Sequence, residues 1–191
     1  MTTIRYKIEF TSFWHTGSGL SSGTESDLVV LKDKNGLPFI PGKTLKGLLR
    51  AAAEIINHFD EKLVSKEFIN KVFGERADEN GNVVPTEAKS FFTDATMSEK
   101  LRSHFIENDD LKPLLYQNIA STKIDGKGQA VDHSLRQVEV SIPLELYAKV
   151  IDVPKGFETQ LESCFAWVKK MGLNRSRGFG RCILQTINSD N

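Results

Sequence analysis

Apolar and polar residues alternate along three long segments of the chain, which is the pattern of strands with one buried face. These segments cover residues 4–14, 138–150 and 181–187, and the second of them is the longest strand that the sequence predicts. A shorter run, Ser90–Ala95, is apolar at its start and is also expected to be a strand. These strands are expected to form one sheet.

Helical spacing of apolar residues marks two further segments. Residues 43–59 and 157–171 each carry large apolar side chains three or four positions apart, so both are expected to be core helices. A more charged helix is predicted over about residues 60–73, where a glycine follows, and a brief one over residues 99–105. Two prolines shortly before the first core helix fix φ and keep that stretch extended.

The main elements follow the order strand, helix, strand, strand, helix, strand, which is that of a ferredoxin-like βαββαβ fold of the α+β class. In this fold both helices cover one face of an antiparallel sheet. The whole chain, residues 1–191, is expected to form a single domain. Its core is expected to comprise residues 1–59, 89–98 and 137–191, with insertions at residues 60–88 and 99–136.

Part of the second insertion, residues 116–136, is mostly polar and contains the sequence Asp-Gly-Lys-Gly at residues 125–128. Such a composition is typical of the tip of a β-hairpin. The segment has too few apolar residues to form a core of its own. We therefore expect it to project from the domain and to become ordered against another molecule.

Charge and composition mainly exclude classes of protein. The 25 Lys and Arg residues balance the 25 Asp and Glu residues, which excludes a uniformly basic nucleic-acid binder but not a protein with one basic face. No apolar run approaches the roughly 18 residues of a membrane span, and the N-terminus lacks the apolar region of a signal peptide. The two cysteines form neither a disulfide framework nor a zinc pattern. We therefore expect a cytoplasmic protein without a membrane partner.

The tripeptide at residues 42–44, Gly-Lys-Thr, has the ending of a phosphate-binding P-loop, Gly-x4-Gly-Lys-Thr. The preceding glycine, Gly36, is one residue too far away. Pro38 and Pro41 also stiffen a loop that would have to curl around phosphates. Nucleotide hydrolysis is therefore excluded.

The start of the first core helix could instead bind the phosphates of a nucleic acid. A helix N-terminus favours anions, and Lys43, Lys46 and Arg50 lie on the helix face opposite the leucines. Together these three side chains could follow a phosphodiester backbone. The ordinary alternative is a solvated helix face, and for these three residues alone that alternative is favoured.

A second basic cluster lies near the C-terminus, where Arg175, Arg177 and Arg181 surround Phe179 among glycines. Glycine lets a backbone approach a ligand closely, and arginine binds phosphates with paired hydrogen bonds and stacks on bases, as phenylalanine does. This density favours a nucleic-acid contact over a helix end followed by ordinary surface arginines. We expect the cluster to lie beside the start of the first core helix, with one ribose-phosphate chain across both.

Two aspartates, Asp27 and Asp33, flank a short apolar segment. Next to a bound phosphodiester, an aspartate could orient a ribose 2′-hydroxyl, bind a metal or accept a proton. Asp33 precedes an Asn-Gly turn and fits the alternative of a turn aspartate, which Asp27 fits less well. His15, beside a Gly-rich segment, is either an acid–base group or a hydrogen-bonded structural residue. No two histidines lie four residues apart, so a metal site built on histidines is not expected.

Three stretches together have a familiar pattern. Residues 37–50 read LPFIPGKTLKGLLR, residues 27–33 read DLVVLKD, and residues 176–180 read SRGFG. They resemble the PxIPGSSLKGxxR signature, the DSPVIKD pattern and the glycine-rich SRGYG loop of the RAMP family of CRISPR-associated proteins. The resemblance is greatest to the repeating backbone subunits of Type III effector complexes. Lys-Thr replaces the usual Ser-Ser, and Leu-Val replaces the usual Ser-Pro.

This resemblance implies a palm of the RNA-recognition-motif type, with a thumb at about residues 116–136. Such subunits polymerise along a CRISPR guide RNA with other effector subunits, and the thumb kinks the duplex of guide and target. The target is a single-stranded RNA that pairs with the guide. A loop aspartate, here Asp27, then cuts the paired target RNA at each kink with a divalent metal, expected to be Mg²⁺. The implied RNA contacts come from the first helix, the loops and the thumb: Lys43, Lys46, Arg50, Arg175, Arg177, Gly178, Phe179, Gly180, His15, Lys123, Lys127 and Arg136.

Three other functions stay open. The altered residues after Asp27 are compatible with a structural or terminal subunit that binds RNA without cutting it. Some relatives are stand-alone endoribonucleases that process repeat RNA, and such an enzyme would use His15 as its acid or base. The last alternative is a ferredoxin-like interaction module that binds no RNA.

Overall fold

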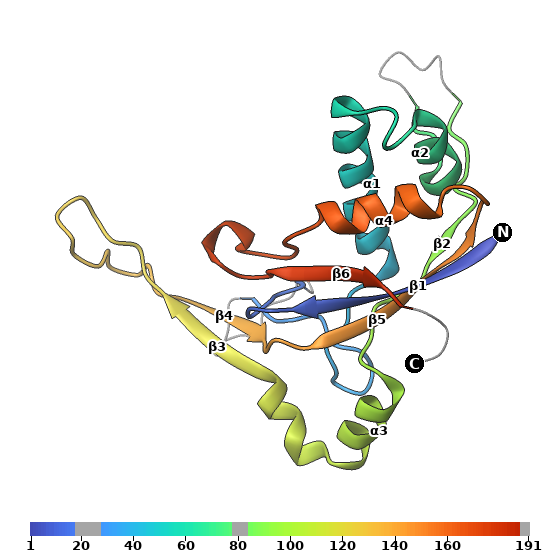
Figure 1. Cartoon of the computed structure of the whole chain (residues 1–191). Coiled ribbons are helices and arrows are strands. Elements are labelled where there is room, and N and C mark those ends of the chain that lie inside the picture. Colours follow the sequence, from blue (N-terminus) through green and yellow to red (C-terminus); the bar gives the residue numbers. More distant parts are fainter. Residues whose placement is uncertain (18–27, 78–83, 188–191) are drawn as a thin grey trace.

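The computed structural model describes residues 1–17, 28–77 and 84–187. Its main sheet has the strand order β2-β5-β1-β6, and all neighbouring strands are antiparallel. These strands are β1 (Thr2–Phe10), β2 (Phe91–Phe92), β5 (Glu145–Val153) and β6 (Cys182–Thr186). Helices α1 (Gly42–Phe59) and α4 (Glu158–Trp167) lie on one face of this sheet (Figure 1). The predicted combination of helices with an antiparallel sheet is confirmed.

Burial alternates along β1 as the sequence predicts. Tyr6, Ile8 and Phe10 are buried, and the residues between them are more exposed. The ring of Tyr6 stacks on that of Phe165 in α4, with centroids 4.5 Å apart, and Leu49 of α1 belongs to the same buried cluster. The core therefore fills the space between the sheet and its two helices.

The first predicted core helix is confirmed as α1, but the helix after it is shorter than expected. α2 spans Lys66–Phe73, whereas a helix over about residues 60–73 was predicted. Asp60 is extended, and its carboxylate accepts hydrogen bonds from the amides of the second and third residues after it. This local turn replaces the first part of the expected helix. Ser65 then caps α2 through its side-chain oxygen, and the helix ends at Gly74.

The prediction of one long strand over residues 138–150 is wrong, because this segment forms two strands in different sheets. β4 (Arg136–Ser141) pairs with β3 (Tyr116–Ser121), whereas β5 pairs with β1. Pro143 lies between β4 and β5, where it has no amide hydrogen to donate to a ladder. The apolar alternation continues across this break, so the sequence pattern does not reveal it.

β3 and β4 form a hairpin that projects away from the main sheet (Figure 1). Residues 122–135, at the end of this hairpin, are exposed almost throughout. The Asp125 carboxylate accepts hydrogen bonds from the amides of Lys127 and Gln129 and so closes the turn. The hairpin extends to Ser141, further than the segment that the sequence marked out.

Two other elements are shorter than predicted. Of the segment predicted as a strand, β2 comprises only Phe91 and Phe92. Thr93 still donates to the carbonyl of Lys149 (3.0 Å), and the chain then bridges Ala95 to Ile40. The second core helix, α4, ends at Trp167, since the next residue adopts an extended conformation. The chain after α4 instead approaches the start of β6, through a bridge between Lys170 and Arg181.

α3 (Glu99–Glu107) confirms the brief helix predicted over residues 99–105, and the 3-10 helix η1 (Asp109–Leu115) follows it and leads into β3. Cys164 and Cys182 are free, and burial raises the pKa of both thiols to about 12, so neither forms a thiolate near neutral pH. In the described part of the chain, every helix is too short or too polar to span a bilayer.

Candidate nucleic-acid interface

Three segments that are distant in the sequence meet where the hairpin joins the rest of the molecule. Isolated β-bridges join residues 14–17 both to residues 28–32 and to residues 138–141, and a third bridge joins the last two segments to each other. We call these three segments the hairpin base. They place the chain that follows β1 and residues 28–32, which precede the PxIPG-containing stretch, against one strand of the projecting hairpin.

Glu139 of β4 joins all parts of the hairpin base. Its main-chain N–H donates to the carbonyl of Leu28 (2.9 Å), and its carboxylate accepts from the amide of Val30 (2.9 Å) and the ammonium of Lys32 (2.8 Å). Its carbonyl accepts a hydrogen bond from Nδ1 of His15 (2.7 Å). The side chain of Glu139 is only 15% exposed, so these bonds are partly shielded from water. Glu139 therefore makes several of the contacts that hold residues 28–32 to the hairpin.

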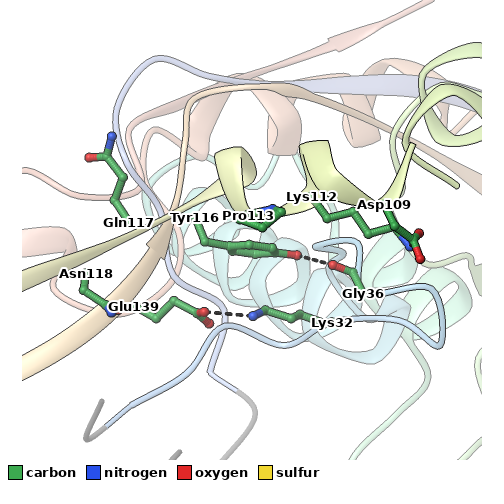
Figure 2. A pocket seen from close by; sticks show the side chains of 9 residues that line it. All are labelled: Lys32, Gly36, Asp109, Lys112, Pro113, Tyr116, Gln117, Asn118 and Glu139. Atoms are coloured by element: carbon green, nitrogen blue, oxygen red, sulfur yellow. Dashed lines mark hydrogen bonds and ion pairs between the residues drawn. The ribbon is translucent and has the colours of Figure 1, made fainter. Parts of the chain in front are cut away.

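Tyr116, at the start of β3, connects the hairpin base to the turn at Gly36. Its hydroxyl donates to the carbonyl of Gly36 (2.6 Å), and the ammonium of Lys32 lies 3.9 Å from the centre of its ring. Burial, together with the nearby negative charges of Glu139 and Asp33, raises the pKa of Tyr116, so the phenol stays protonated and remains a donor. Figure 2 shows these contacts around a cavity of about 520 Å³.

The amines that line this cavity are already paired. Lys32 binds Glu139, and the ammonium of Lys112 lies 2.5 Å from the carboxylate of Asp109 (Figure 2). An anion entering the cavity would therefore have to displace a carboxylate from its partner. The cavity fits a structural junction between the hairpin and the turn better than an RNA site.

Asp33 is a turn aspartate, as the ordinary alternative predicted. Its carboxylate accepts hydrogen bonds from the amides of Asn35 (2.8 Å) and Leu37 (3.0 Å) and from the guanidinium of Arg102 (2.8 Å). Burial alone would favour the neutral acid, but these donors outweigh it and hold the pKa of Asp33 below its ordinary value. Asp33 therefore stabilises the turn as a carboxylate.

The glycine-rich loop between α4 and β6 packs against the chain that enters the hairpin base. The amide of Leu173 donates to the carbonyl of His15 (3.0 Å), and the amide of Gly180 donates to the carbonyl of Phe13 (2.7 Å). A Cβ at Gly172 would lie 2.4 Å from the His15 carbonyl oxygen, and the φ of Gly172 is +90°. Glycine is needed here because no other residue allows this close approach.

This loop presents the predicted arginines to solvent. Arg175 and Arg177 lie in the short 3-10 helix η2 (Arg175–Arg177) and are exposed, and Phe179 is half-buried. Gly178 has a φ of +94° with open space around it, whereas Gly180 is packed against the main chain of the loop. The loop and the hairpin base thus share the main chain of residues 13–15.

The basic residues of the hairpin are also accessible. Lys123, Lys127 and Arg136 are all exposed. Within the described ranges, no ion pair engages these three side chains or those of Arg175 and Arg177. Five cations on the hairpin and the loop are therefore free to bind an anion, and their RNA contacts stay predictions.

The three basic residues of α1 do not form one solvated row. Lys43 is exposed and Lys46 is half-buried, but the side chain of Arg50 is only 11% exposed. Its guanidinium donates to the carboxylate of Glu54 (2.7 Å) and to the carbonyl of Gly74 (3.0 Å). Arg50 therefore ties α1 to the end of α2, and an RNA contact of this residue would have to replace these bonds.

The start of α1 does not lie beside the glycine-rich loop, contrary to our expectation. The amide of Gly42 donates to Asp94 (2.7 Å), just after β2, whereas the loop leads into β6 at the opposite edge of the sheet. β2 also pairs with Val150, whose other partner is Ile4 near the start of β1. The loop instead packs beyond Phe10, where β1 ends. Opposite edges and opposite ends of the sheet therefore separate the two basic clusters.

His15 is placed as a structural residue. Its side chain is 1% exposed, and because a carbonyl only accepts, Nδ1 must carry the proton in its bond to Glu139. RNA could reach this imidazole only after the packing around it opened. A contact between His15 and RNA stays a prediction, and the geometry favours a role in positioning the hairpin base.

Asp27, the predicted catalytic residue, lies outside the described residues. Its neighbour Leu28 belongs to the hairpin base and is partly exposed. Among the residues that the structure does describe, no three His, Cys, Asp or Glu side chains are grouped so that they could hold a metal ion.

The residues that build this site were largely missed by sequence reasoning. Glu139 was only one of the polar positions in an alternating strand, and Tyr116 only the start of a polar insertion. The one available signal was the position of Glu139, which lies between Val138 and Val140 shortly after the segment predicted as the hairpin. Nothing in the sequence indicates that its partners come from residues more than a hundred positions earlier.

Comparisons with known proteins agree with this architecture. The chain is similar to a chain in the cryo-EM structure of the Type III-B Cmr-beta complex bound to cognate target RNA, with a TM-score of 0.71, 14% identity and 97% of each chain covered. It is similar to a chain of the Type III-B Cmr-beta complex in the apo state, with a TM-score of 0.69, 14% identity and 98% of each chain covered. No curated protein matches the chain. The family model of the RAMP superfamily matches residues 7–183. The chain therefore belongs to the RAMP superfamily.

Proposed function

We propose that this protein is an RNA-binding backbone subunit of a Type III-B CRISPR effector complex. The observation that carries the proposal is the packing of the glycine-rich loop on residues 13–15, which brings the exposed Arg175 and Arg177 next to the hairpin base. Arginines on a glycine-rich turn bind phosphates well because their planar groups make paired hydrogen bonds. A similar chain belongs to a complex bound to cognate target RNA, which supports RNA as the ligand.

The proposal also includes the ferredoxin-like arrangement of the strands and the RNA and protein partners. The strand order β2-β5-β1-β6 with α1 and α4 on one face supports a ferredoxin-like frame, from which the β3–β4 hairpin projects as the thumb. We propose guide RNA and single-stranded target RNA as ligands, and further copies of the chain with other effector subunits as neighbours. A formal net charge of zero suits a protein with one face on RNA and other faces on subunits.

Charge reversal in the loop tests RNA binding. Arg175→Glu combined with Arg177→Glu is expected to weaken binding of single-stranded RNA by about 10- to 100-fold and to make the affinity less dependent on salt, because two phosphate contacts are lost. Fluorescence anisotropy at several salt concentrations measures both effects. The matched control is Lys62→Glu with Lys155→Glu, which makes the same change in net charge at two exposed lysines outside the loop. Equal affinities for the two double variants would contradict the proposal.

We further propose that the subunit cleaves the bound target RNA and that Asp27 is required. The support is the resemblance of residues 27–33 to the aspartate-containing RAMP pattern, together with the position of Leu28 in the hairpin base. RNA carries its own nucleophile, because a ribose 2′-hydroxyl that gives up its proton can attack the adjacent phosphorus and form a 2′,3′-cyclic phosphate. The bond from phosphorus to the 5′-oxygen breaks in the same step, and this oxygen takes up a proton to leave as a 5′-hydroxyl. Bending the RNA strand so that these atoms are aligned would lower the activation free energy by several kcal/mol. The buried His15 gives no support to the stand-alone endoribonuclease.

Cleavage is tested in the assembled complex. Asp27→Ala is expected to reduce target cutting at least about 100-fold and to leave guide RNA binding unchanged, because the residue would act only in the chemical step. Gel analysis of labelled target RNA, with and without EDTA, also tests the divalent metal. Asp33→Asn is the control, since Asp33 serves the adjacent turn. Undiminished cutting by Asp27→Ala would remove Asp27 from the mechanism, and a wild-type complex that does not cut would favour the non-catalytic subunit.

A further inference from the structure

α1 and α4 cover only one face of the main sheet (Figure 1). The alternation of burial along β1 and β5 places a separate set of charged side chains on the opposite face. Ile4, Tyr6 and Ile8 point into the core, so Arg5 and Lys7 of β1 point to this open face. In β5 the buried residues are Leu146, Ala148 and Val150, so Tyr147 and Lys149 point the same way. The two central strands thus bring three cations and one aromatic ring together.

The register of the two strands puts like charges opposite each other. Arg5 pairs with Lys149 and Lys7 pairs with Tyr147. Like charges in directly opposite positions destabilise a sheet unless something neutralises them. In the described part of the chain, no carboxylate forms an ion pair with either Arg5 or Lys149. This pair of cations is therefore uncompensated.

Lys7, the third cation on this face, has counter-ions within the sheet. The ammonium of Lys7 lies 2.7 Å from the carboxylate of Glu145 and 3.3 Å from that of Glu9. The hydroxyl of Tyr147 donates to Glu145 as well (2.6 Å). Lys7 is thus neutralised within the sheet, and its carboxylate partner also fixes the ring of Tyr147. Of the three cations on this face, Arg5 and Lys149 have no ion-pair partner among residues 1–17, 28–77 and 84–187.

These residues line a groove of about 740 Å³ between the sheet and the segment that leads into α3. The segment after β2 also lines it, with three hydroxyl residues, Thr93, Thr96 and Ser98, and two acidic residues, Asp94 and Glu99. One oxygen of Asp94 already accepts from the amide of Gly42. The groove therefore combines free cations, a fixed aromatic ring and several hydrogen-bond acceptors.

We propose that this groove binds a segment of single-stranded RNA, at a place separate from the hairpin base. A phosphate lies between Arg5 and Lys149, and a base stacks on Tyr147. Four-stranded sheets bind single-stranded RNA on their open face in this manner, through aromatic side chains on the strands. The inference rests on the proposed function, because it takes RNA as the ligand of this chain.

The lining favours RNA over an acidic peptide, which the two cations alone would also attract. Asp94 and Glu99 also line the groove, and their charge would repel peptide carboxylates and RNA phosphates alike, so charge does not separate the two ligands. Carboxylates accept hydrogen bonds from ribose hydroxyls and from the amino groups of bases, which RNA carries at every nucleotide. An aromatic ring at the floor adds stacking, which requires a planar partner.

The test uses single charge reversals that preserve the fold. Lys149→Glu places a carboxylate opposite Arg5, and Arg5→Glu does the same opposite Lys149, so each variant gains a cross-strand ion pair while the site loses its positive charge. Each is made in the full chain that already carries Arg175→Glu and Arg177→Glu. The affinity for a labelled single-stranded RNA 12-mer is expected to fall a further tenfold or so, whereas Lys155→Glu leaves it unchanged.

Ultraviolet cross-linking of the same RNA, mapped by mass spectrometry, gives an independent result. A cross-link at Tyr147 is expected in the wild-type chain and is lost in Lys149→Glu. Unchanged affinity with no cross-link on β1 or β5 overturns the inference, and so does competition by polyglutamate at this face without RNA binding there. The loop variant, Arg175→Glu with Arg177→Glu, is compared with the wild-type chain separately from Lys149→Glu. If the loop variant keeps the wild-type affinity and the added Lys149→Glu lowers it, the groove binds RNA and the RNA contacts proposed beside the hairpin base are wrong.

Discussion

Replacing Glu139 with alanine is expected to detach residues 28–32 from the hairpin and to lower the free energy of unfolding by about 2–3 kcal/mol. The change leaves the amide of Val30 without its acceptor and the ammonium of Lys32 without its counter-ion, and both groups are partly shielded from water. Urea unfolding measures the stability. Hydrogen exchange at Val30 is expected to become faster, because its amide then faces no carboxylate.

Two further variants separate the contributions to this junction. Glu139→Gln keeps an oxygen for the amide of Val30 and loses only the ionic part of the contact, so its loss of stability is expected to be smaller. Glu162→Ala, at an exposed position of α4, is the control for losing a glutamate and is expected to change stability by less than about 0.5 kcal/mol. If Glu139→Ala unfolds at the same urea concentration as this control, Glu139 does not hold the hairpin base together.

The local elements of the fold could be predicted because they depend on neighbouring residues. The helical spacing of Leu45, Leu49 and Ile56 marks α1, and the alternation of Tyr6, Ile8 and Phe10 marks β1, since each pattern requires only one buried face. The predicted elements were least accurate where one polar or cyclic residue interrupts a continuous pattern. Asp60 and Pro143 each do so, the first by closing a turn and the second by ending a strand.

The candidate site could be predicted only in part, because its contacts are long-range. Arginines among glycines indicate a nucleic-acid surface from their chemistry alone, and the exposure of Arg175 and Arg177 is compatible with that role. The clustering of cations along α1 by itself favoured a solvated face for Arg50, but its guanidinium donates to main-chain carbonyls at the end of α2, and its RNA contact stays a prediction. A helical pattern shows which residues share a face, not what packs against that face. The hairpin base consists of contacts between segments distant in the sequence, so no local pattern could predict it.

Within α1, two glycines are expected to respond to alanine in opposite directions. A Cβ at Gly42 would lie 2.0 Å from the carbonyl oxygen of Phe92, so Gly42→Ala must push the start of α1 away from β2. This shift also strains the hydrogen bond between the Gly42 amide and Asp94. The free energy of unfolding is expected to fall by about 3 kcal/mol, because the clash is with main-chain atoms that cannot rotate away.

Gly47→Ala is the matched control in the same helix. Gly47 is exposed, and a Cβ there would meet nothing within 4 Å. Alanine is expected to stabilise the protein by about 0.5–1 kcal/mol, because it reduces the backbone freedom of the unfolded chain without adding a clash. Thermal unfolding of the two variants therefore gives shifts of opposite sign. If Gly42→Ala raises the melting temperature as Gly47→Ala does, or leaves it unchanged, the close contact between α1 and the carbonyl of Phe92 is not as the structure has it.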